Sequence, residues 1–226
     1  MTAQRVALRA VAFDLDGTLV DSAPDIGHAL NSALRASGLP GFELEQVREW
    51  IGDGPDVLIE RALRALGGAE SAALRTELRG VFDRITLQAP LTHGKVYDGI
   101  AALLQQLQPG WPMVVVTNKP TQLARAVLQA GGLLECFAAV FGADTAELRK
   151  PAPTMLQRAA LQLGIGTHEL LMVGDSGADL RCAAAAGSPA VWVGWGYGGL
   201  HALPVQPRWR IDHPGQVLGI VQPQDA

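Results

Sequence analysis

Short apolar runs are the feature that most restricts the fold of this chain. They cover residues 6–13, 113–118, 138–142, 170–175 and 190–195. Near-continuous apolarity, without polar alternation, is typical of parallel strands in a sheet covered on both faces. Between these runs lie helical stretches that end in glycine, two of which begin with proline. The alternation predicts an α/β fold with a Rossmann-like, doubly wound parallel sheet.

Residues 22–90 carry a different pattern. Apolar residues recur there at the spacing of one helix face, as at Ile26, Leu30 and Leu34. No strand pattern interrupts this block, and residues 90–94 resemble a return linker. The sequence therefore predicts an α-helical cap domain at 22–90, inserted into a core domain made of residues 1–21 and 91–226.

Charge and composition exclude several classes of partner. The net charge is −4 and no basic run occurs, so we expect no nucleic-acid partner. No apolar run approaches the ~18 residues of a membrane span, and the N-terminus lacks a signal-peptide pattern, so we expect a cytoplasmic protein with no membrane partner. The two cysteines, Cys136 and Cys182, lack zinc-ligand spacing. The predicted cap faces are compatible with a monomer or a homodimer.

Polar motifs follow the predicted strands, where the carboxyl ends of parallel strands meet at one edge of a sheet. Residues i and i+2 of an extended segment point the same way, so Asp14 and Asp16 both reach this edge while Leu15 points into the core. The remaining polar residues of these motifs are Thr117, Asn118, Lys119, Asp175 and Asp179, and Lys150 stands just before the helical stretch that begins at Pro151.

The carboxylates at this edge predict a metal site and a pair of reactive acids. Asp14, Asp16 and Asp175 would repel one another as bare anions, and an oxygen-preferring cation such as Mg²⁺ resolves that conflict. Asp14 lies nearest the strand end and is the better candidate for a nucleophile that attacks phosphorus. Asp16 is then the candidate for the general acid and base.

The motifs DxDGT, a threonine after an apolar strand, Lys-Pro and GDxxxD occur in an order that resembles the haloacid dehalogenase superfamily of aspartyl-phosphate phosphohydrolases. The resemblance covers nearly the whole chain, and the helical insertion matches the small cap of one subgroup. Within it, "FDLDGTLVDSAPDI", "WIGDGPDVLIERAL", "VTNKP", "KPAP" and "VGWGYGG" are most similar to bacterial phosphoglycolate phosphatases. The chain departs from that subgroup at Gly177 and Ala178, where larger polar residues are usual.

The resemblance implies a set of metal ligands. These are the side chain of Asp14, the backbone carbonyl of Asp16 and the side chain of Asp175. Asp179 joins the metal site by holding a metal-bound water or Lys150, because it lies one helical turn beyond Asp175.

Other motif residues are candidates for binding the substrate. Thr117 offers a hydroxyl to a phosphate, and Lys150 offsets the charge of the phosphate and of the nucleophile. Asn118 and Lys119 complete this set, since the resemblance implies that Lys119 faces the substrate. In the cap, Arg48 is a candidate for pairing with a substrate carboxylate.

The predicted function is a Mg²⁺-dependent phosphomonoesterase for a small phosphorylated metabolite, and the subgroup resemblance implies 2-phosphoglycolate. A sugar-phosphate phosphatase, such as one acting on N-acetylmuramic acid 6-phosphate, and a phosphosugar mutase are the alternatives. A dehalogenase is excluded by Asp16, and a phosphonate hydrolase by the absence of lysine from residues 20–92. The alternative from another class is a binding protein on the same fold without catalysis.

Overall fold

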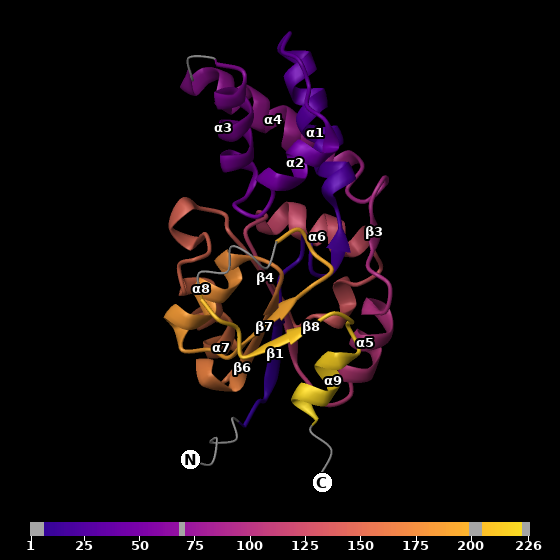
Figure 1. Cartoon of the computed structure of the whole chain (residues 1–226), viewed down its shortest axis with the longest axis vertical. Coiled ribbons are helices and arrows are strands. Elements are labelled where there is room, and N and C mark those ends of the chain that lie inside the picture. The colour runs from indigo at the N-terminus through magenta and orange to yellow at the C-terminus, as the bar shows by residue number, and fades with distance from the viewer. Residues whose placement is uncertain (1–6, 68–70, 199–204, 223–226) are drawn as a thin grey trace.

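The computed structural model describes residues 7–67, 71–198 and 205–222, and a six-stranded sheet is its central element (Figure 1). The strands run in the order β5-β4-β1-β6-β7-β8, and every neighbouring pair is parallel. Their bounds are β1 Ala10–Phe13, β4 Met113–Thr117, β5 Ala139–Gly142, β6 Leu170–Gly174, β7 Ala190–Val193 and β8 Trp209–Ile211. The chain builds outward on one side of β1 and then on the other, so a topological switch point lies between β1 and β6.

Helices cover both faces of the sheet, and the strand residues alternate between them. Val11 and Phe13 of β1 pack in one apolar cluster with α5 (Ile100–Leu107), α6 (Thr121–Ala130) and α9 (Gln216–Val221). Ala10 and Ala12 pack in a second cluster with α7 (Thr154–Leu163) and α8 (Gly177–Ala186). Because both faces are buried, both sets of side chains are apolar, which explains the near-continuous apolar runs.

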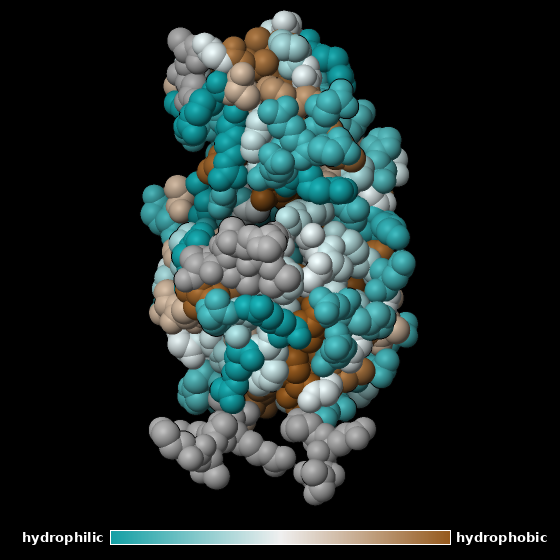
Figure 2. Space-filling view, viewed as in Figure 1, coloured by the Kyte–Doolittle hydropathy of each residue, from teal (hydrophilic) through white to brown (hydrophobic). Residues whose placement is uncertain are grey.

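Four helices form a separate layer above the sheet, drawn from indigo to magenta in Figure 1. We call them the cap helices: α1 Ala23–Ala36, α2 Leu44–Trp50, α3 Pro55–Ala65 and α4 Ala72–Gln88. They share an apolar cluster of their own, to which the sheet layer contributes Leu123 of α6. Hydrophilic residues cover most of the face of these helices that is visible in Figure 2.

A short antiparallel ribbon connects the two layers. Strand β2, Val20–Asp21, pairs with β3, Lys95–Val96, where the chain leaves the sheet layer and where it returns. In the loop just before β3, the backbone N–H groups of Thr92, His93 and Gly94 all donate to the carboxylate of Asp25 in α1. These bonds hold together the two segments that connect the sheet layer with the cap helices.

The α/β fold with its doubly wound parallel sheet and helical insertion is confirmed. Differences from the sequence prediction lie at the ends of elements and in the shortest ones. Strand β1 begins at Ala10. Residues 1–6, and Gly199 of the glycine-rich motif, lie outside the described residues. The sequence did not predict β2, β3, β8, α5 and α9. No helix within the described ranges is long and apolar enough to cross a membrane.

Candidate active site

The predicted site residues of three neighbouring strands meet at the switch point. Asp14 directly follows β1, Thr117 ends β4 and Asp175 directly follows β6. Strand β1 pairs with both β4 and β6, so these residues come together at the carboxyl edge of the sheet. The cap helices lie beyond that edge (Figure 1).

Three carboxylates form a compact buried group. One oxygen of each of Asp14, Asp175 and Asp179 lies within 4.8 Å of the others. Burial raises the pKa of Asp14 to about 7, and Lys150 offsets this rise only in part. Burial and the neighbouring Asp179 raise the pKa of Asp175 to about 6. Deprotonated carboxylates are therefore unfavourable here unless further positive charge is present.

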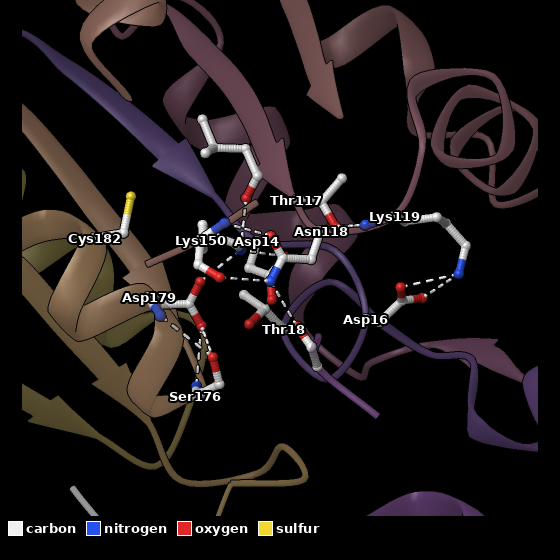
Figure 3. A network of polar contacts seen from close by, with 12 residues as sticks. Asp14, Asp16, Thr18, Thr117, Asn118, Lys119, Lys150, Ser176, Asp179 and Cys182 are labelled. Carbon is white, nitrogen blue, oxygen red and sulfur yellow. Dashed lines mark hydrogen bonds and ion pairs between the residues drawn. The ribbon is translucent and has the colours of Figure 1, made fainter. Parts of the chain in front are cut away.

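Lys150 supplies the positive charge that faces this group. Its Nζ lies 2.8 Å from Asp14 Oδ1 and 2.6 Å from Asp179 Oδ1, and it also donates to the carbonyl of Val116 at 2.9 Å (Figure 3). Burial disfavours the Lys150 charge, but Asp14 and Asp179 outweigh that effect and raise the pKa of Lys150. One ammonium faces three carboxylates, and the excess of two negative charges matches a divalent cation.

Asp16 lies apart from the acidic group, but it lines the same cavity as Asp14. Lys119 Nζ donates to both carboxylate oxygens of Asp16 at 2.9 Å, and the Ser22 hydroxyl also donates to it. Figure 3 shows this pair on the other side of the loop that carries Asp14. The Asp16 side chain lies in the cavity wall together with Gly54 and Leu58 of the cap helices and their connecting loop.

A cavity of about 30 Å³ lies between the sheet layer and the cap helices. The sheet layer contributes Asp14, Asp16 and Thr117 to its wall, and the cap contributes Gly54 and Leu58. Thr117 Oγ1 accepts a 3.2 Å bond from the N–H of Lys119, so its own proton is available for an acceptor in the cavity.

A second, larger cleft of about 300 Å³ approaches the site from beside α2. Asp16 and Asp175 line it on one side and Arg48 and Glu49 on the other. Arg48 lies 3.6 Å from Asp21 and stacks over the Tyr197 ring. Among the described residues, Arg48 Nε is the one buried side-chain nitrogen or oxygen without a hydrogen-bond partner.

A glycine-rich loop after β7 holds Asp175. The loop does so through its backbone, so the residue types in the sequence do not assign this role to the loop. The backbone N–H groups of Tyr197 and Gly198 donate to Asp175 Oδ2 at 2.7 and 3.3 Å. A Cβ on Gly196 would lie 2.3 Å from the Cβ of Asp175, so only glycine allows this approach. The recurrence of glycine at every second position of "VGWGYG" is the signal that could have indicated such a loop.

Comparisons with known proteins agree with this geometry. The family model of the haloacid dehalogenase-like hydrolases matches residues 8–187. A phosphoglycolate phosphatase of Yersinia pseudotuberculosis is 40% identical over 192 residues, which cover 84% of this chain and 83% of that protein. One from Pectobacterium atrosepticum is 38% identical over 221 residues, covering 97% and 94%.

Solved structures give the same result. The crystal structure of a predicted phosphoglycolate phosphatase from Haemophilus somnus superimposes with a TM-score of 0.87 at 29% identity, covering 96% of this chain and 99% of that one. The family match spans more than half of the chain, and the solved relative shares its fold over 96% of the chain. The chain belongs to the haloacid dehalogenase-like hydrolases, and it is a phosphoric monoester hydrolase of that family.

Proposed function

We propose that this phosphatase depends on Mg²⁺ and hydrolyses 2-phosphoglycolate to glycolate and phosphate. The observation that carries the proposal is the buried group of Asp14, Asp175 and Asp179, whose negative charge Lys150 balances only in part. Phosphatases of this family generally use a divalent metal, and carboxylates are ligands that Mg²⁺ prefers. The names of the relatives support 2-phosphoglycolate as the substrate.

Asp14 and Asp16 divide the covalent chemistry between them. An oxygen of Asp14 attacks phosphorus, and the bond from phosphorus to the substrate oxygen breaks as the aspartyl-phosphate forms. Asp16 in its protonated form gives a proton to the departing oxygen, and the carboxylate that remains later takes a proton from the water that hydrolyses the intermediate. Asp14, Asp175 and the backbone carbonyl of Asp16 would hold Mg²⁺, which would supply positive charge for the phosphate. Asp179 orients the ammonium of Lys150 beside Asp14.

The remaining polar residues hold the substrate. Thr117 donates its free proton to a phosphate oxygen, and Lys150 offsets the charge that builds up beside Asp14. Lys119, which pairs with Asp16, turns to the substrate when it enters. Arg48, with a buried and unpartnered Nε at the larger cleft, binds the substrate carboxylate.

The same proposal covers the organisation and location of the protein. Residues 22–90 act as a cap domain over a core of 1–21 and 91–226, which is supported by the separate apolar cluster of the cap helices. A cytoplasmic location is supported by the free thiols of Cys136 and Cys182, since a reducing compartment keeps cysteines unpaired.

Phosphate release from a panel of phosphoesters tests the proposal. The panel contains 2-phosphoglycolate, N-acetylmuramic acid 6-phosphate, hexose phosphates and pyrophosphate, each with Mg²⁺ and with EDTA. We expect kcat/KM for 2-phosphoglycolate to exceed the others by at least about a hundredfold. Asp14→Asn should lower kcat by at least about a thousandfold, with an unchanged circular dichroism spectrum.

Other outcomes of the panel separate the alternatives. Preference for a sugar phosphate would replace the substrate and keep the mechanism, and phosphate transfer between sugar hydroxyls would indicate a mutase. Residual activity of Asp14→Asn within about tenfold of the wild type would overturn the nucleophile assignment. A wild-type protein without Mg²⁺-dependent turnover of any phosphoester would indicate a binding protein.

A further inference from the structure

The side-chain amide of Asn118 is committed to bonds within the protein. Its Oδ1 accepts a 2.7 Å bond from the backbone N–H of Lys150. Its Nδ2 donates to the backbone carbonyl of Lys150 at 3.2 Å and to that of Gly52 at 2.9 Å. Both amide protons are therefore used, and the residue is only 4% exposed.

These bonds connect the two layers of the molecule at the active site. Lys150 lies in the sheet layer, and Asn118 holds both the N–H and the carbonyl of this one residue. The side chain of the same lysine reaches Asp14 at 2.8 Å. Gly52 lies in the loop between α2 and α3, so the third bond of the amide ends in the cap.

A second contact presses the same loop of the cap onto Asn118. The backbone of Gly54 approaches so closely that a Cβ built on it would lie 2.8 Å from the backbone carbonyl oxygen of Asn118. Gly54 also has a φ of +85°, which favours glycine. Nearby, Arg149 pairs with Asp56 of α3 at 3.6 Å. The loop of residues 51–54 is thus seated directly on Asn118.

We propose that Asn118 is a positioning residue that couples the seating of the 51–54 loop to the position of Lys150. The rotation of an asparagine amide about χ2 has only broad intrinsic preferences, so its plane is set by the partners that it binds. The Gly52 carbonyl orients the amide, and the oriented amide holds the peptide groups of Lys150 with its ammonium against Asp14. The inference rests on the proposed role of Lys150 in the reaction.

This role differs from the substrate contact that the sequence predicts for Asn118. A phosphate or a carboxylate needs hydrogen-bond donors, and both donors of the Asn118 amide already bind carbonyls. Breaking them for the substrate would leave the buried carbonyls of Gly52 and Lys150 without their partner, which is unfavourable. Asn118 therefore acts through Lys150 and the cap loop, and the substrate contacts other residues of the site.

Two substitutions remove the contact from opposite sides. Asn118→Ala removes the amide, and Gly54→Ala pushes the loop away from Asn118 without touching the amide. We expect each to lower kcat by about ten- to hundredfold, because a displacement of about 1 Å at a catalytic group has such effects. For Asn118→Ala, KM and the inhibition constant of inorganic phosphate should change by less than about threefold, because no substrate contact is lost.

The double variant is decisive. If the two changes disrupt one coupled unit, Asn118→Ala with Gly54→Ala should have a kcat no lower than the more impaired single variant. Multiplicative losses would overturn the coupling. A wild-type kcat for Gly54→Ala, together with a raised KM and a raised phosphate inhibition constant for Asn118→Ala, would instead assign Asn118 to substrate binding.

Gly38→Ala is the matched control for backbone strain. Gly38 lies beyond the end of α1 with a φ of +72°, and a Cβ there meets nothing within 4 Å. Its variant should lose stability but keep the wild-type kcat.

Hydrogen–deuterium exchange gives a readout that does not depend on turnover. The amides of residues 51–54 should exchange faster in Asn118→Ala than in the wild type or in Gly38→Ala. Unchanged exchange would overturn the proposal even if the enzyme is active. Faster exchange in a protein that hydrolyses no phosphoester would preserve the contact and reject the proposed function alone.

Discussion

At the scale of single residues, the charges of the site fall into two sets with different balance. Lys119 and Asp16 form a neutral pair at the boundary with the cap. Lys150 instead faces more carboxylates than it can neutralise, and burial prevents water from screening them. The first set is balanced without a ligand, whereas the second favours a cation. Arg48 is a third case, since its guanidinium is only partly paired.

Arg48→Met tests the carboxylate site directly. We expect KM for 2-phosphoglycolate to rise about ten- to hundredfold, because a hydrogen-bonded charge contributes about 1.5–3 kcal/mol. KM for 2-hydroxyethyl phosphate, which replaces the carboxylate by an alcohol, should not change. Arg158→Met, on an exposed arginine of α7, is the control. Equal losses with both substrates would remove Arg48 from carboxylate recognition.

At the scale of elements, the start of α8 joins helix capping to the chemistry of the site. Ser176 is the N-cap residue, and its Oγ accepts from the N–H of Asp179. Asp179 in turn accepts from the N–H and the hydroxyl of Ser176 through Oδ2, while its Oδ1 binds Lys150. One carboxylate therefore completes a capping box and holds the ammonium beside Asp14.

Ser176→Ala should consequently affect both stability and rate. We expect the free energy of unfolding to fall by about 1 kcal/mol, as for other N-cap serines, and kcat to fall as well. Ser71→Ala is the matched control, since Ser71 caps α4 in the same way by accepting from Leu74 N–H. It should lose similar stability in urea unfolding and keep its kcat. A normal kcat in Ser176→Ala would separate the cap from the catalytic group.

At the scale of the whole molecule, the buried carboxylates couple folding to protons and metal. The folded-state pKa values of Asp14 and Asp175, about 7 and about 6, lie above the ordinary value of 3.8. The folded protein therefore binds more protons than the unfolded chain between pH 4 and pH 7. The contribution of these two carboxyl groups to the free energy of unfolding therefore decreases as the pH rises through that window. A cation bound to the carboxylates reverses this loss of stability.

The Tm of the protein in EDTA should therefore decrease between pH 5 and pH 8. Added Mg²⁺ should raise the Tm more at pH 8 than at pH 5, and each 1 kcal/mol corresponds to about 2–4 °C for a chain of this size. Asp175→Asn, which removes one of these charges, should show a weaker dependence on both pH and Mg²⁺. A Tm gain that is the same at both pH values would contradict the linkage.

Much of the fold could be predicted because its signals are local. A buried parallel strand needs apolar side chains on both faces, and each cap helix needs one apolar stripe, so both patterns are visible within a few residues. Strands β2, β3 and β8 contain two or three residues each, which is too short for a pattern. They form because the neighbouring chain is already in place to pair with them.

For the active site, the sequence by itself determined which acids and lysines follow the strands, and the parallel order brought Asp14, Asp175 and Lys150 to one edge. Only the tertiary structure decided the partners: Lys119 for Asp16, and the cap loop for Asn118. The physical reason is that these contacts join residues far apart in the chain, several of them through backbone groups. Every residue carries the same N–H and carbonyl, so no residue type in the sequence marks them.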